Sequence, residues 1–169
     1  MPRHGARVAT LALAELGEIF ALRAAMLGIA ARRFAEARDA DALRPLDDLV
    51  RRMHAAAADP KTAPPRFGAL SIAAQQLVIE ASRTRFLGGL YEQLSGLGSW
   101  RLIRGKAASF VTQAGRRESA RDWRRVAQAI ARGDGEAAER AARDLLVHSA
   151  ARVQAQLPRE PDGARLTPA

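Results

Sequence analysis

Residues 11–37, LALAELGEIFALRAAMLGIAARRFAEA, decide the fold. Their large apolar side chains recur every three or four positions. This spacing places them along one stripe of an amphipathic helix, because a helix completes a turn in about 3.6 residues. We therefore predict a helix from Leu11 to Ala37 that packs through this stripe, which comprises Leu16, Phe20, Met26, Leu27, Ala30 and Phe34.

The same spacing continues to the C-terminal part of the chain. Prolines at positions 60, 64 and 65 mark a loop, and glycines between Ser95 and Gly115 predict a kinked or broken stretch. No segment of useful length alternates apolar and polar residues, so we expect no substantial sheet. The fold class is therefore predicted to be an all-α antiparallel bundle of six to seven helices. The further helices are expected from the turn at residues 39–41 to Ala58, at Phe67–Ser82, from Phe86 to about Leu97, at Arg117–Arg132 and at Glu136–Gln156.

The length and composition limit the class of protein. A chain of 169 residues is one compact domain, and the absence of cysteine excludes disulfide scaffolds and thiolate chemistry. The formal net charge is +9, and all but two of the 27 basic residues are arginines. Because the arginine pairs are spread over several predicted helices rather than gathered in one run, we expect a solvated helix surface. Nucleic-acid binding by the bundle itself remains an alternative that needs a contiguous basic face.

The chain is expected to be soluble and cytoplasmic, without a membrane partner. Its longest apolar runs are well short of the about 18 residues that a spanning helix needs. No apolar segment with a small-residue cleavage site follows Met1 either.

Arg23 lies within the apolar stripe of the first helix. A guanidinium there needs a partner, because burying an unpaired charge costs several kcal/mol. One reading is a carboxylate partner on another helix, or a side chain that reaches solvent at the edge of the stripe. The other is an anchor for a ligand carboxylate or phosphate at the floor of a pocket.

Three further residues are candidate ligand-binding residues with Arg23. Ser71 and Gln75 are one turn apart on the third helix and could reach one cavity, or they could face solvent or bond a neighbouring helix. Trp123 lies on the apolar side of its helix, so it is either a core aromatic or part of the same site. If buried, its indole N–H needs an acceptor.

The sequence offers no sign of catalysis, and we expect that the protein is not an enzyme. Asp144 and His148 are spaced i, i+4, which favours an exposed ion pair over a metal site, since two ligands are too few. Nucleophile elbows, phosphate-binding loops and dinucleotide-binding glycine runs are absent from the sequence.

The order of the helices and four local sequences resemble the FCD domain, the C-terminal effector-binding domain of the FadR subfamily of GntR transcriptional regulators. The resemblance covers residues 11–156 and places Arg23 on the arginine that these domains usually show in their first helix. Residues 157–169 have three prolines and no apolar periodicity, so we expect a disordered tail there. The resemblance implies that the protein forms a homodimer and that it binds a small molecule, an anionic effector. The four sequences are ELGEIFALRAAM at 15–26, LRPLDDL at 43–49, LVIEASRTRFL at 77–87 and VAQAIARGDGEAA at 126–138.

The family typically binds a divalent metal through one aspartate and three histidines. By resemblance, these positions fall on Ser71, Gln75, Trp123 and Leu145, so all four ligands are missing. This set has neither imidazole nor carboxylate donors. We therefore expect a pocket without metal or other cofactor, in which the effector meets Arg23 and Gln75 directly.

Residues 1–10 are interpreted as a linker or a wing remnant. Regulators of this kind resemble a winged helix-turn-helix followed by the FCD domain, and Arg3–Ala9 resembles the last strand of a wing. DNA would be bound only through that winged helix-turn-helix, which we expect to be absent here. A truncated regulator and a stand-alone descendant are both compatible with this sequence.

Two other interpretations stay open. The chain could be a structural or protein-interaction bundle whose pocket has collapsed, with Trp123 and Leu145 filling the space. At the level of fold alone, a TetR-type ligand-binding bundle is the alternative.

Overall fold

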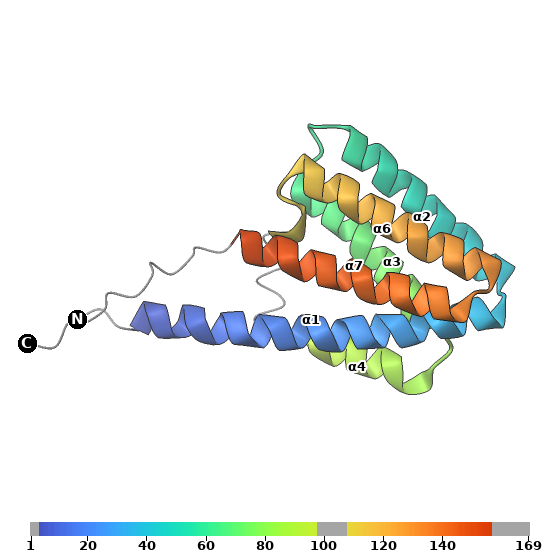
Figure 1. Cartoon of the computed structure of the whole chain (residues 1–169), viewed down its shortest axis with the longest axis horizontal. Coiled ribbons are helices and arrows are strands. Elements are labelled where there is room, and N and C mark those ends of the chain that lie inside the picture. Colours follow the sequence, from blue (N-terminus) through green and yellow to red (C-terminus); the bar gives the residue numbers. More distant parts are fainter. Residues whose placement is uncertain (1–3, 98–107, 157–169) are drawn as a thin grey trace, which may run out of the picture.

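The computed structural model describes residues 4–97 and 108–156, with side chains from Leu16 onward. Within these residues the chain forms six α-helices and one short 3-10 turn, with no strand (Figure 1). The predicted all-α fold is confirmed. The helices are α1 (His4–Ala37), α2 (Ala40–Ala58), α3 (Pro64–Ala81), α4 (Arg85–Gly96), α6 (Gln113–Arg132) and α7 (Gly135–Ala155), with the turn η1 at Ala108–Phe110.

The long helix α1 and the last helix α7 lie antiparallel along much of their length (Figure 1). Gly28 allows this close approach, because a Cβ atom there would lie 2.9 Å from Arg143 Cγ. Helix α6 packs on α7 and α2, while α3 packs on α2 and α1. Helix α4 packs on α1 and α3, so α1, α3 and α4 together surround one region of the core.

The core contains the stripe that the sequence analysis identified. Its residues are buried along α1, and Phe34 is only 1% exposed. The facing helices contribute their own large apolar side chains, which removes most of this apolar surface from water. Prominent among them are Leu46, Met53, Phe67, Val78, Val126, Leu145 and Leu146.

Three helices begin at least three residues earlier than the sequence predicted. Helix α3 starts at Pro64 because proline is tolerated in the first turn, where its missing N–H is not needed. Helix α6 starts at Gln113 because the Thr112 hydroxyl accepts the Gly115 N–H at 3.0 Å and so caps the helix. Helix α1 starts at His4, within the stretch that the sequence analysis interprets as a linker or a wing remnant.

Two predicted segments fall wholly or partly outside the described residues. The expected tail at 157–169 lies outside them, and so does the middle of the glycine-containing stretch, at 98–107. On either side of this gap, α4 ends at Gly96 and η1 begins at Ala108, so the chain does interrupt its helices there. Among the described helices, none is both long and apolar enough to cross a membrane.

Candidate functional site

Arg23 lies in the interior of the bundle. Only 2% of the residue is exposed, which rules out a side chain that reaches solvent. Its Nη2 donates to Gln75 Oε1 of α3 at 3.0 Å, and its Nη1 donates to Ser95 Oγ of α4 at 3.2 Å. The guanidinium is therefore held between two helices by neutral side-chain oxygens, which accept from its Nη1 and Nη2 atoms.

Tyr91 of α4 completes the surroundings of the guanidinium. The Arg23 Cζ atom lies 4.4 Å from the centre of the Tyr91 ring, a distance at which the ring face attracts a cation. The Tyr91 hydroxyl is 3.4 Å from Gln75 Oε1, to which it donates. Gln75 thus accepts from both the arginine and the tyrosine. This arrangement orients its amide with the oxygen towards Arg23.

Trp123 and Ser71 form a second buried pair beside the first. The indole Nε1 of Trp123 donates to Ser71 Oγ at 3.0 Å, and the tryptophan is completely buried. This meets the expectation that a buried indole N–H finds an acceptor. Trp123 is therefore a core aromatic, and Ser71 bonds a neighbouring helix.

Helix α3 links the two pairs. Ser71 and Gln75 are one turn apart and both are buried, so they lie on the same inward face of the helix. The structure thus brings Arg23 to Gln75 and Trp123 to Ser71. All four candidate residues lie in the interior, where they form two hydrogen-bonded pairs.

Sequence reasoning missed the two residues that α4 contributes. Tyr91 falls four residues after Leu87, in the buried stripe of that helix, and Ser95 follows four residues later. Tyrosine in an apolar stripe was the available signal, because its hydroxyl needs a polar neighbour when the ring is buried. Ser95 gave no comparable signal, since it is only partly buried.

The four positions that the resemblance assigns to metal ligands do not fit a divalent cation. Leu145 is buried and has no donor atom, and the indole N–H of Trp123 donates to Ser71 rather than offering a lone pair. In the described part of the chain, no group of three or more histidine, cysteine, aspartate or glutamate side chains is placed to hold a metal ion.

A second polar cluster lies between α6 and α7 and corrects one expectation. His148 Nδ1 lies 3.1 Å from Asp122 Oδ2 of α6, so its partner is not Asp144 as the spacing suggested. Asp122 is buried and also receives a hydrogen bond from Arg125. Arg152 Nη1 lies 3.5 Å from Glu118, and burial lowers the pKa of its guanidinium. The cluster borders a cavity of about 550 Å³.

Many of the arginines outside these sites pair with a carboxylate on their own helix. Arg44 with Asp41, Arg51 with Asp48 and Arg140 with Glu136 are examples, each spaced by three or four residues. Such exposed pairs contribute about 0.3–0.5 kcal/mol each, so they coat the surface rather than hold the bundle together.

Residues 18–148, which include every residue of the two buried pairs, match the family model described as the FCD domain. No protein in the curated set matches the chain.

Proposed function

Because the chain belongs to the FCD domain family, the C-terminal domain of GntR-type regulators, we propose that it binds a small organic acid at Arg23. In this proposal it is the effector-binding and dimerisation domain of a FadR-subfamily transcriptional regulator. The pocket works without metal, and the protein is not an enzyme. DNA is bound by a winged helix-turn-helix of the regulator, and the place of action is the cytoplasm.

The observation that carries this proposal is the burial of the Arg23 guanidinium in the interior of the bundle, next to the side-chain oxygens of Gln75 and Ser95. Arg23 presents planar N–H groups that match a carboxylate in a bidentate manner. A ligand carboxylate exchanges with Gln75 Oε1 as the acceptor, and the Gln75 amide then turns its NH₂ group towards the ligand. A bond from the guanidinium to a carboxylate oxygen then replaces one to a neutral amide oxygen, which favours the acid over an uncharged compound.

The dimer that we propose uses helix α4. Phe86 and Leu90 are exposed and lie one turn apart on this helix, Leu97 is exposed directly after its end, and Phe86 is 78% exposed. A second copy of the chain is the occupant that suits this stripe, because two-fold symmetry brings the same apolar patch to itself. Since Tyr91 and Ser95 of the same helix surround Arg23, effector binding moves the dimer face as well.

A second candidate function is favoured by the full burial of Trp123. Together with Leu145 it fills the region that the resemblance assigns to the metal, so the domain would act as a structural or protein-interaction bundle with a collapsed pocket. In that case Arg23 only ties α1 to α3 and α4.

Thermal unfolding in the presence of a panel of mono- and dicarboxylic acids tests the proposal. At least one acid should raise the melting temperature of the wild type, since a ligand at 100 times its Kd stabilises the folded state by about 2.7 kcal/mol. The shift should vanish in Arg23→Met and shrink in Gln75→Leu, and it should persist in Arg140→Met, a change of an exposed arginine. EDTA should leave the wild-type melting temperature unchanged. If no acid shifts the wild type, the collapsed bundle is the better description.

A further inference from the structure

A groove between α2 and α3 forms a cavity of about 520 Å³. It lies on the α2 side of α3, whereas Ser71 and Gln75 lie on the buried face of that helix. The volume falls within the range of about 300–1,000 Å³ that is usual for small-molecule sites. Its lining comprises Leu49, Arg52, Ala55, Ala56, Asp59, Thr62, Arg66, Ala69, Leu70 and Ala73.

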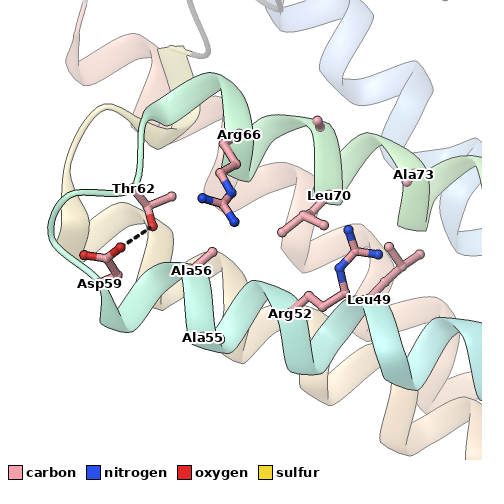
Figure 2. A pocket seen from close by; sticks show the side chains of 10 residues that line it. Leu49, Arg52, Ala55, Ala56, Asp59, Thr62, Arg66, Leu70 and Ala73 are labelled. Carbon is pink, nitrogen blue, oxygen red and sulfur yellow. Dashed lines mark hydrogen bonds between the residues drawn. The ribbon is translucent and has the colours of Figure 1, made fainter.

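Two guanidinium groups converge on this groove from opposite walls. Figure 2 shows Arg52 reaching up from α2 and Arg66 reaching down from α3 towards the same space. Arg52 is 3.7 Å from Asp48 Oδ2, but Arg51 lies closer to that carboxylate, at 3.0 Å from Oδ1. Within residues 16–97 and 108–156, no hydrogen bond or ion pair involves the Arg66 guanidinium. Arg66 therefore has no countercharge among these residues, and Arg52 shares the carboxylate of Asp48 with Arg51.

Asp59 lies at the loop end of the groove but does not supply that countercharge. Its Oδ1 accepts the Lys61 backbone N–H at 2.9 Å, and its Oδ2 faces the Thr62 hydroxyl at 3.5 Å, the contact drawn in Figure 2. Both oxygens are thus engaged in shaping the loop. Counting Arg52, Arg66 and Asp59, the groove has one positive charge in excess.

The floor of the groove is apolar and formed by small side chains. Four alanines leave the space open, Leu70 lies between the two guanidinium groups, and Leu49 lies beyond Arg52 (Figure 2). A ligand that suits both features has one anionic head for the arginines and an apolar body for the alanines and leucines. A dianionic phosphate suits it less, because Asp59 repels the second charge.

We propose that the groove between α2 and α3 binds a small monocarboxylate with an apolar body, as a site separate from Arg23. The carboxylate lies between Arg52 and Arg66, and the body lies against Ala55, Ala69 and Leu70. This site does not depend on the proposed effector function.

Calorimetric titration with 4-phenylbutyrate tests the assignment. The neutral amide of the same acid is the control ligand, because it has the same apolar body without the charge. Binding of the acid should be at least tenfold tighter than binding of the amide. Arg52→Gln and Arg66→Gln should each weaken the acid at least tenfold, whereas Arg140→Gln, an exposed arginine of α7, should leave it unchanged. Because all three side chains are exposed, the variants should keep the wild-type melting temperature.

Backbone amide chemical shifts locate the bound acid independently of the variants. Shifts at residues 55, 56, 69 and 73 support the groove. Shifts confined to residues 23, 75 and 91, or binding that is lost in Arg23→Met but kept in both glutamine variants, would overturn the assignment. Inorganic phosphate that displaces the acid at equal concentration would overturn the preference for a monocarboxylate.

Discussion

The buried side chains of Trp123 and Ser71 form a hydrogen bond with each other, from the indole N–H to the serine hydroxyl oxygen. Removing either partner leaves the other unsatisfied, which costs about 1–3 kcal/mol. We therefore expect Trp123→Phe and Ser71→Ala to destabilise the protein, and their double variant to cost about 1 kcal/mol less than the sum. Denaturant unfolding of the four proteins measures this coupling. Strictly additive losses would mean that the hydrogen bond does not contribute.

His54 of α2 makes stability depend on pH. Its pKa is lowered from the usual value of 6.5, first by burial and then by the positive charges of Arg124 and Arg121 on α6. The unfolded chain therefore takes up a proton more readily than the folded one. The stability that His54 contributes is complete above pH 6.5 and is lost as the pH falls through the lowered pKa.

We expect the free energy of unfolding of the wild type to decrease between about pH 7.5 and about pH 5.5, and that of His54→Gln to decrease less. Urea unfolding at both pH values measures the difference. A parallel decrease in the two proteins would show that other groups carry the effect.

At the level of the element, the end of α6 depends on one glycine. Gly133 has φ = 68°, in the left-handed region, and its N–H bonds to Ile130 O. A Cβ there would lie 2.6 Å from Arg38 Cζ. Gly133→Ala should therefore destabilise the protein by about 1–2 kcal/mol. The alanine would hold a strained left-handed backbone conformation, and the Arg38 side chain would have to move away from the new Cβ atom.

Gly17 provides the matched control for this prediction. It lies within α1, and a Cβ there meets no atom within 4 Å. Gly17→Ala should stabilise the protein by about 0.5–1 kcal/mol, since alanine favours the helix. Thermal unfolding of both variants checks the opposite signs. Equal changes in the melting temperatures of the two variants would show that the left-handed conformation of Gly133 does not matter for stability.

Helix positions could be predicted from the sequence where apolar spacing is regular, and less well where helices begin. The stripe from Leu16 to Phe34 was sufficient for the core of α1. The start at Pro64 was missed because two prolines also mark a loop, and the choice depends on whether the next residues find packing partners. The start at Gln113 was missed because Gly115 suggested a break, whereas its N–H serves the Thr112 cap.

The site was predictable in part for a similar reason. Periodicity placed Arg23 and Trp123 in apolar stripes and put Ser71 and Gln75 one turn apart, but it left open whether these two face the interior or solvent. It could not say which would bond which, because that depends on how α1, α3 and α6 pack. The pairing of His148 with Asp122 shows the same limit. Spacing along α7 suggested Asp144 as the partner of His148, but the packing of α6 against α7 brings Asp122 to it instead.

On the scale of the whole molecule, the exposed stripe of α4 should set the oligomeric state. We expect the wild type to behave as a dimer and Phe86→Glu combined with Leu90→Glu to behave as a monomer, because two buried carboxylates oppose association. Light scattering after size exclusion gives the masses. Val147→Glu, a change at an exposed valine of α7, is the control and should remain dimeric. A wild type that is monomeric at every concentration would contradict the proposed face.

The fully buried indole of Trp123 makes its intrinsic fluorescence a probe of the protein interior. The chain has two tryptophans, and Trp100 lies outside the described residues. In a Trp100→Phe background, all indole emission comes from a ring that sits in a dry environment, one turn of α3 away from the partner of Arg23. A red shift of that emission would signal that water or a ligand has entered the interior, and no dye or label would be needed to see it.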